Sequence, residues 1–370
     1  MKSFDVVIAG GGIIGCALAR ALAGEGVRVA VVERGALGEE ASWAAAGMLA
    51  PSGEAEQESP IFALCRASLQ QYRQLSGELE SETGIGCEYR AEGTLVVFAD
   101  EQERQALRPS MEWQRSLGIP IEELSATELQ EREPQLAAFT GAFYLPEDHQ
   151  VDNRLLMQAL VQSCRRRGVE FVLGKAVVEV ERNGRRASGV LLENDRIQAG
   201  QVVNTAGAWA GAIRVPGLAP APIRPVKGHM LALECRPGFL RHVVRHQNQH
   251  VYLVPRSGGR ILVGSTMEEV GFDKTPRSGP LTHLLRAAQQ LCPLLEESAV
   301  EGFWAGLRPA SPDGFPLLGP TALEGYVVAL GHFRNGILLA PITAAILTGW
   351  IIRGKPPFPT DAVLPGRFAQ

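Results

Sequence analysis

Short apolar runs and segments of helical spacing alternate at the start of the chain. Residues 4–9 (FDVVIA) and 27–33 (VRVAVVE) are short and mostly apolar, which is typical of strands that are buried on both faces. Residues 13–26, between them, have helical apolar spacing and end at glycines. We therefore predict a strand–helix–strand unit with a parallel pair of strands.

Similar elements recur far downstream. Residues 154–168 carry helical spacing and lead into an apolar run at 169–174. Residues 176–193 read as a hairpin that turns at Asn183 and Gly184, and residues 201–207 as another buried strand. We infer that distant segments complete the sheet of the first unit.

Two other regions differ in character. Residues 87–141 are charged and partly helical, with a capping-box pattern at Ser125 and Glu128. Residues 221–300 favour strands, including a pair around a Ser-Gly-Gly turn within 251–266. Because 370 residues exceed what one core usually serves, we predict two interleaved domains. The first comprises residues 1–86, 142–220 and 300–370, and the second comprises 87–141 and 221–299.

Composition narrows the function classes. With 45% hydrophobic and 21% charged residues the chain is globular, and a net charge of -4 gives no broad positive field for nucleic acid. The six cysteines show no close pairing, so neither a zinc ribbon nor a dithiol centre is indicated, and free thiols suit the cytoplasm.

Two segments have features of membrane signals. Residues 1–24 resemble a signal peptide, but Asp5 interrupts the apolar region. Residues 336–352 are mostly apolar, yet they are short for a membrane span and contain Pro341. We predict a buried terminal helix and no stable membrane insertion.

A glycine motif follows the first predicted strand. Gly10, Gly12 and Gly15 give the G-x-G-x-x-G spacing at the start of a helix, which allows a tight turn, close approach of a pyrophosphate and close helix packing. Glu33 ends the next strand at the distance expected for a ribose-binding acid. The motif predicts dinucleotide binding but does not separate nicotinamide from flavin.

Further motifs carry a resemblance to a known family. They are SWAAAGMLAP (42–51), NTAGAWA (204–210), RPVKGHM (224–230), FWAGLRP (303–309), GLRPASPDGFPLLG (306–319) and GHFRNGILLAP (331–341). With them the chain resembles the D-amino acid oxidase family of FAD-dependent amine oxidases, and within it the glycine-oxidase branch of the thiamine pathway. The resemblance implies an α/β fold in which a glutathione-reductase-type FAD-binding domain is interleaved with a substrate domain built on a large antiparallel sheet.

The resemblance also implies the cofactor site. Because residues 306–319 contain no cysteine of the kind that links flavin covalently in monomeric sarcosine oxidases, we expect noncovalent FAD. A helix that begins at Asn335 or Gly336 would point its N–H groups at the flavin, although an ordinary capped helix is the alternative. The expected FAD contacts are Gly10, Gly12, Ile13, Ile14, Gly15, Glu33, Arg34, Ser42, Ala46, Gly47, Met48, Val177, Ala206, Gly207, Trp209, His332, Phe333, Arg334, Asn335, Gly336, Ile337 and Leu338.

The substrate residues follow from the same resemblance. Arg308 matches the residue that binds the substrate carboxylate, and Tyr252 a second carboxylate contact, with a structural ion pair and a packed strand aromatic as the alternatives. Met48 and Met267 match positions lining a small pocket, or they fill core gaps. The backbone carbonyl of Arg334 would receive the amine. No catalytic acid or base is expected.

Three histidines, at 242, 246 and 250, would share one face of a helix as metal ligands do. Their segment leads directly into a predicted strand and contains no carboxylate, so we predict no metal.

The activity implied is oxidation of glycine, sarcosine and small D-amino acids by oxygen to an imine or glyoxylate, ammonia and hydrogen peroxide. A cytoplasmic homotetramer that serves a thiazole synthase is implied by the family alone. The alternatives are a D-amino acid dehydrogenase that passes electrons to a quinone and a non-catalytic FAD-binding protein.

Overall fold

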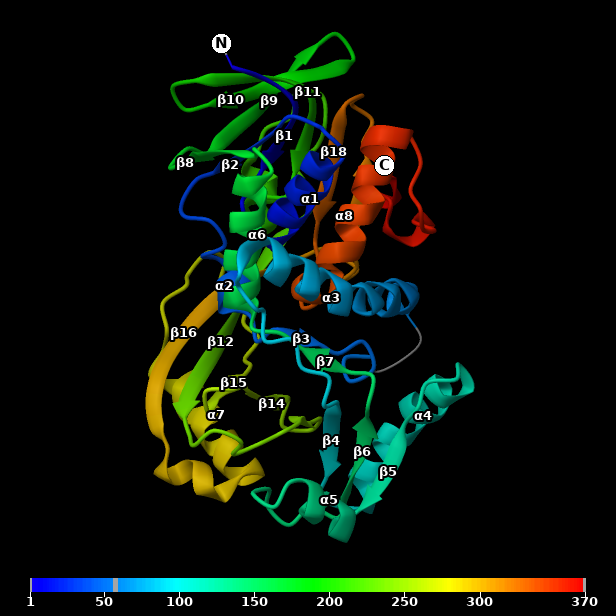
Figure 1. Ribbon diagram of the computed structural model, residues 1–370, viewed down its shortest axis with the longest axis vertical. Helices are drawn as coiled ribbons and strands as arrows, with labels where there is room; N and C mark the ends of the chain where they lie inside the picture. The colour runs from blue at the N-terminus through cyan, green and yellow to red at the C-terminus, as the bar shows by residue number, and fades with distance from the viewer. Residues whose placement is uncertain (1, 56–58, 369–370) are drawn as a thin grey trace.

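The computed structural model describes residues 2–55 and 59–368. Its chain forms two eight-stranded sheets at opposite ends of an elongated molecule, and both termini lie on the side of the first sheet (Figure 1). The strands of the first sheet are β1 (Ser3–Ala9), β2 (Val29–Glu33), β8 (Glu170–Leu173), β9 (Val177–Asn183), β10 (Arg186–Leu192), β11 (Arg196–Asn204), β17 (Leu317–Pro320) and β18 (Tyr326–Leu330).

The first sheet has the order β17-β18-β11-β1-β2-β8, and β9 and β10 extend it from β11 as an antiparallel hairpin. The pairs among β18, β11, β1, β2 and β8 are parallel. The predicted strand–helix–strand unit and the hairpin at Asn183 and Gly184 are thus confirmed.

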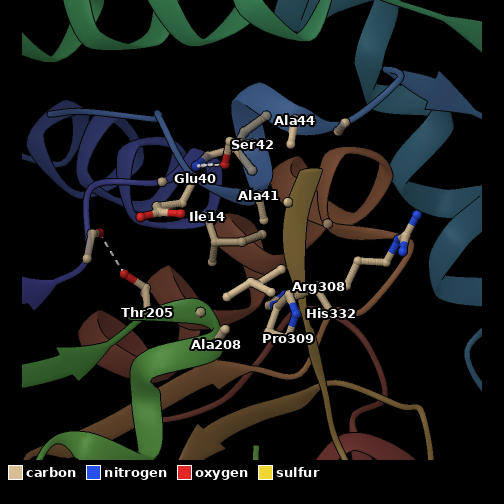
Figure 2. A pocket seen from close by; sticks show the side chains of 18 of the residues that line it. Ile14, Glu40, Ala41, Ser42, Ala44, Thr205, Ala208, Arg308, Pro309 and His332 are labelled. Carbon is tan, nitrogen blue, oxygen red and sulfur yellow. Dashed lines mark hydrogen bonds between the residues drawn. The ribbon is translucent and has the colours of Figure 1, made fainter. Parts of the chain in front are cut away.

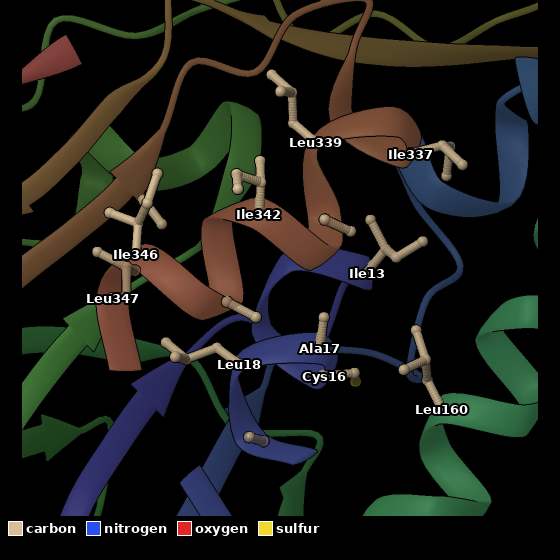
Figure 3. Packing of buried hydrophobic residues seen from close by; sticks show 14 of the residues in the cluster. Ile13, Cys16, Ala17, Leu18, Leu160, Ile337, Leu339, Ile342, Ile346 and Leu347 are labelled. Atoms are coloured by element: carbon tan, nitrogen blue, oxygen red, sulfur yellow. The ribbon is translucent and has the colours of Figure 1, made fainter. Parts of the chain in front are cut away.

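Three helices pack together beside the first sheet: α1 (Ile13–Gly24), α6 (Asn153–Arg166) and α8 (Gly336–Arg353). Ile342 and Ile346 of α8 belong to the same buried apolar cluster as Ala17 and Leu18 of α1 (Figure 3). Burial of this apolar surface makes the main contribution to the free energy that holds the three helices together.

The second sheet has the order β16-β12-β15-β14-β13-β4-β6-β5. Its pairs are antiparallel except for β4 with β13, so the predicted antiparallel sheet is mixed at that one pair. Its strands are β4 (Thr94–Phe98), β5 (Glu122–Ser125), β6 (Gly141–Leu145), β12 (Arg224–Glu234), β13 (Val243–His246), β14 (Val251–Pro255), β15 (Arg260–Gly264) and β16 (Ala299–Ala310).

Helix α3 (Phe62–Thr83) runs between the two sheets and contacts α6 and α8 (Figure 1). A small antiparallel pair, β3 (Met48–Leu49) with β7 (His149–Gln150), also lies between them. The remaining helices are α2 (Ala41–Ala44), α4 (Glu101–Ser116), α5 (Ala126–Arg132) and α7 (Ser278–Leu291), with short 3-10 turns at η1 (Gly207–Ala212), η2 (Pro293–Glu297), η3 (Asp361–Val363) and η4 (Pro365–Phe368). Ser125 and Glu128 form the predicted capping box of α5.

The strand pairing places two strands, β6 and β16, differently from the predicted domain boundaries. Strand β6 pairs with β4 and β5, and β16 pairs with β12 along most of its length. Both strands therefore belong to the second sheet, whereas boundaries at 142 and 300 assign them mostly to the first domain. Strands of the two sheets alternate in blocks along the chain, and we propose that β6 and β16 belong to the second domain.

Helix α8 is the one helix among the described residues that is long and apolar enough to cross a membrane, and 61% of it is buried inside the protein. It is therefore a core helix, as the sequence predicts.

The histidine segment is not a helix around residues 243–246, because these residues form β13. His242 Nδ1 lies 2.7 Å from Glu133 Oε1, and His246 Nε2 lies 3.1 Å from Glu103 Oε2. The segment itself lacks a carboxylate, but the fold brings one to each of these two histidines from a distant part of the chain.

Candidate active site

A cavity of about 320 Å³ lies between the two sheets and is lined by residues of both. One side is built from residues that end or follow β1, β2, β11 and β18, which are Gly10, Glu33, Thr205 and Gly331 among others. The carboxyl ends of parallel strands are the usual place for a ligand in such sheets. The other side comes from β12, β14 and β16 of the second sheet. Figure 2 shows Ile14, Ala41 and Ser42 near the cavity together with Arg308, Pro309 and His332.

The glycine turn has no room for side chains at two of its three positions. Gly10 has φ of 111°, and a Cβ there would lie 2.6 Å from the Thr205 carbonyl oxygen. A Cβ at Gly15 would lie 2.0 Å from the Gly10 carbonyl oxygen. At Gly12, by contrast, the nearest atom is Ser42 Oγ at 3.3 Å. Gly12 therefore leaves space that a ligand can occupy, as a pyrophosphate requires.

The N-terminus of α1 borders this space. Gly12 is its N-cap and has no side chain to accept the first N–H groups, one of which, from Ile13, is donated to Ser42 Oγ at 2.9 Å. The helix start combines unsatisfied N–H groups with the positive end of the helix dipole, which suits a phosphate.

Glu33 is fixed beside the glycine turn at one end of the cavity. Its carboxylate accepts hydrogen bonds from the backbone N–H groups of Gly11 at 2.7 Å and Gly35 at 2.9 Å. A carboxylate has about four acceptor positions, so two remain for ribose hydroxyls. Nearby, the Arg34 guanidinium lies 3.6 Å from the centre of the Trp209 ring, and Arg34 also pairs with Glu40 at 2.7 Å.

Three side chains from other elements hold the run of small residues at 41–48. Arg256 donates to the carbonyl of Ala46 at 2.7 Å, Asn153 to that of Ser42 at 2.7 Å and Trp304 to that of Ala44 at 3.1 Å. These bonds fix a backbone of low bulk along the cavity, as a flat ring system would need. The residues that line the cavity therefore fit FAD.

Arg308 extends from β16 into the end of the cavity that Gly228 of β12 and Ser265 border. It donates from Nη1 to the Thr266 carbonyl at 3.1 Å and from Nη2 to Ser265 Oγ at 2.7 Å. Burial lowers the pKa of Arg308, but a guanidinium remains protonated in proteins. The result is a preoriented cation with donors left over for an anion.

Tyr252 lies beside this cation, close enough to interact with Arg308. Its ring is buried, and its hydroxyl donates to Met230 Sδ at 3.4 Å. Met48 also lines the cavity. Arg308, Tyr252 and Met48 are thus brought together as the resemblance implies.

Glu54 is a second charged group at this end of the cavity. Its carboxylate pairs with Arg245 and, at 2.6 Å, with Arg334. Burial raises the pKa of Glu54, but the attraction of Arg245, Arg334 and Arg308 outweighs it and lowers the pKa on balance. Glu54 therefore stays ionised and holds Arg334 at the cavity wall.

The loop before α8 closes the remaining side. His332 is buried and its Nε2 lies 3.0 Å from Thr343 Oγ1. Burial lowers the pKa of His332 to about 3, so the ring is neutral near pH 7. Helix α8 begins at Gly336 with Asn335 as its N-cap, as predicted.

Most of the predicted site residues line the cavity, but four do not. Met267 is 63% exposed, because the chain has left β15 for the surface, and the prediction that it closes the pocket is corrected. Leu338 is 1% exposed and packs into the core between α8 and α1. Gly15 allows helix α1 to pack closely against the Gly10 carbonyl, and Asn335 is the N-cap of α8.

Several residues that line the Arg308 end of the cavity had no predicted role. They are Glu54, Gly228, Met230 and Ser265. Successive residues of a strand point to opposite faces, so Gly228 and Met230, two residues apart on β12, lie on the same face. This spacing is visible in the sequence. The pairing of β12 with β16, which brings Gly228 beneath Arg308, is visible only in the fold.

Comparisons with known proteins agree with this geometry. Residues 5–350 match the family described as FAD dependent oxidoreductase (DAO). The chain is 35% identical to a glycine oxidase of Pseudomonas aeruginosa over 95% of both chains. It is 36% identical to a bifunctional ThiO/ThiG protein of Trichormus variabilis, of which it covers 53%.

A solved structure agrees as well. The crystal structure of glycine oxidase from Geobacillus kaustophilus is 34% identical, covers the whole of both chains and superposes with a TM-score of 0.94. Together with the cavity, these similarities show that the chain belongs to the DAO family of FAD-dependent oxidoreductases and is a homologue of the glycine oxidases.

Proposed function

We propose that the protein oxidises glycine, sarcosine and small D-amino acids with noncovalently bound FAD and oxygen. Each substrate gives an imine, which water hydrolyses to an oxo acid and the amine: glycine gives glyoxylate and ammonia. Oxygen takes up the two electrons and two protons and leaves as hydrogen peroxide. The observation that carries the proposal is the Arg308 guanidinium, which Ser265 and Thr266 hold at the substrate end of the cavity.

In this proposal Arg308 binds the substrate carboxylate and Tyr252 assists it. A planar guanidinium fixes a carboxylate in two bonds, and this orients the α-carbon of the substrate. Bound FAD supplies the acceptor for the hydride that leaves this carbon. The backbone carbonyl of Arg334 receives the amine, and no protein acid or base is assigned, since His332 is neutral and bonded to Thr343.

The residues beside Arg308 support a small substrate. Met48, Met230 and Tyr252 line the cavity together with Arg308, and we infer that these bulky side chains restrict the size of the substrate. Among the described residues that line the cavity there is no cysteine, which supports noncovalent FAD.

The biological setting is proposed from the relatives. Fusion of a similar chain to a second part in the bifunctional ThiO/ThiG proteins supports delivery of the imine to a thiazole synthase. The relatives named glycine oxidase support the substrate class. A cytoplasmic homotetramer is proposed from the family resemblance.

The test is an anaerobic screen that follows bleaching of the flavin by glycine, sarcosine, D-alanine, D-phenylalanine and L-alanine, followed by oxygen uptake. We expect rapid bleaching by the first three, slow bleaching by D-phenylalanine and none by L-alanine. Equal rates for D-phenylalanine would favour a general D-amino acid oxidase. Bleaching without oxygen uptake would favour the quinone-linked dehydrogenase, and a flavin that no amine bleaches would favour a non-catalytic protein.

A further inference from the structure

Helix α8 contains a proline near the end that faces the cavity. Pro341 is buried and has no N–H group, so the carbonyl of Ile337, four residues earlier, loses its partner within the helix. A buried carbonyl without a hydrogen-bond partner destabilises the folded protein. The same turn of α8 supplies Gly336 and Ile337 to the cavity wall.

Helix α3 supplies the missing partner. The Tyr72 hydroxyl, fully buried, donates to the Ile337 carbonyl. One turn earlier on α3, Ser68 Oγ donates to the Leu338 carbonyl at 2.6 Å and accepts from the Ile342 N–H at 3.3 Å. Ser68 thus bridges the next backbone pair of α8. Ser68 and Tyr72 are four residues apart and therefore lie on one face of α3. This face donates hydrogen bonds to the carbonyls of both Ile337 and Leu338.

These contacts lie directly behind the start of α8. The first N–H groups of a helix have no acceptor within it, and they carry the positive end of its dipole. A Cβ at Gly336 would have His332 Cβ at 3.7 Å as its nearest neighbour, so a ring can approach this turn. A proline-weakened turn needs an external support if it is to hold its N–H groups toward a ligand.

We propose that Tyr72 and Ser68 are positioning residues that hold the first turn of α8 against the flavin, and that they thereby strengthen FAD binding and raise the reduction potential of the flavin. The proposal rests on the FAD site and not on the identity of the substrate. An anion that develops on reduction is stabilised by correctly placed N–H groups, so displacement of this turn disfavours the reduced state more than the oxidised state.

The experiment measures the FAD dissociation constant and the flavin midpoint potential in Tyr72→Phe, Ser68→Ala, Pro341→Ala and the Tyr72→Phe/Pro341→Ala double variant. We expect Tyr72→Phe to weaken FAD binding roughly five- to tenfold, the equivalent of one lost buried hydrogen bond, and to lower the potential. In the Pro341→Ala background, where the new N–H can bond to the Ile337 carbonyl, removal of the Tyr72 hydroxyl should have little effect.

The matched control is Thr83→Val, which removes another buried hydroxyl of α3 that bonds to the Leu79 carbonyl at the opposite end of the helix. It should lower thermal stability without changing FAD affinity or potential. The proposal is overturned if Tyr72→Phe behaves like Thr83→Val, or if its effect is equally large with Pro341 replaced. Should Tyr72→Phe not fold, Ser68→Ala decides by the same two measurements. Neither measurement uses an amine, so failure here leaves the proposed oxidation untouched.

Discussion

Gly228 on β12 lies against the guanidinium of Arg308 on β16: a Cβ at Gly228 would lie 2.0 Å from Arg308 Nη1. The two strands pair so that Gly228 is opposite Gly306, two residues before Arg308. The long arginine side chain lies across the space that the missing Cβ leaves. The orientation of the Arg308 guanidinium, the proposed carboxylate anchor, therefore depends on a glycine at position 228.

Replacing Gly228 by alanine should displace the guanidinium and raise KM for glycine by about tenfold or more, because an ångström of misplacement at an oriented site is costly. FAD content should stay normal. The control is Gly302→Ala on β16, where a Cβ would make an ordinary 3.7 Å contact with Trp304. An unchanged KM in Gly228→Ala would show that Arg308 does not set substrate binding.

Removing the cation itself gives a larger effect. Arg308→Ala should reduce kcat/KM for glycine by roughly thirty to a few thousand fold, since truncating one member of a buried charge pair costs about 2–5 kcal/mol. FAD should remain bound. Arg308→Lys should recover only part of the loss, because an ammonium cannot reproduce two parallel bonds.

An amine without a carboxylate is the internal control for Arg308. Its slow oxidation should hardly differ between the wild type and Arg308→Ala. Equal losses for glycine and for this amine, or no loss for either, would remove Arg308 as the carboxylate anchor and make Arg334 the next residue to test.

Substitutions at Gly12 and Gly15 should separate an effect on cofactor binding from an effect on folding. Gly12→Val should give folded, colourless protein, because only Ser42 Oγ lies within 4 Å of the new Cβ but the ligand space is filled. Gly15→Ala should lower the melting temperature of the apoprotein as well, since its Cβ would meet the Gly10 carbonyl at 2.0 Å. Thermal unfolding and the flavin absorbance report the two effects, and yellow Gly12→Val with normal FAD affinity would refute the assignment.

The dinucleotide end could be predicted from sequence because its signals are local. A strand, a glycine turn, a helix and an acid at the end of the next strand all lie within residues 3–33, and the structure places Gly10, Gly12 and Glu33 around one cavity. The beginning of α8 was predictable for the same reason, since a polar run meets an apolar one at Gly336.

The substrate end was harder because it depends on pairing between distant strands. Glu54, Met230 and Ser265 come from a loop, β12 and the residue after β15, and no spacing in the sequence relates them. Met267 shows the converse: two residues beyond Ser265 the chain is already at the surface. Helix α3 was not predicted, although its buried positions, such as Leu69, have helical spacing.

Met230 and Met267 should differ in their effect on substrate size. Met230 is 2% exposed and lines the cavity beside Tyr252, whereas Met267 is 63% exposed. Met230→Ala should therefore improve the rate with D-phenylalanine relative to glycine, with some loss of stability from the cavity it leaves. Met267→Ala should leave both rates unchanged. If only Met267→Ala changed the ratio, the exposed methionine would be the one that closes over the substrate.

His332 should make stability depend on pH. Burial lowers its pKa to about 3, while in the unfolded chain a histidine titrates near 6.5. As pH falls through 6.5 the unfolded chain takes up a proton that the folded protein does not, so the unfolding free energy falls by up to about 1.4 kcal/mol per pH unit until the folded pKa is reached. The contribution of a neutral, buried His332 is fully present above pH 6.5.

The pH dependence of the unfolding free energy of the whole protein does not by itself isolate the contribution of His332. Burial raises the pKa of Asp148 to about 7, and that carboxyl has the opposite sign: it stabilises the fold as pH falls from 7 toward 4. The measurement is therefore the difference between wild type and His332→Gln in urea unfolding at constant excess FAD from pH 5 to pH 8. The variant should lose less stability on acidification, because a glutamine in contact with Thr343 does not titrate. Parallel curves across this range would mean that His332 is protonated equally in the folded and unfolded states, and its role as a neutral wall of the cavity would have to be abandoned.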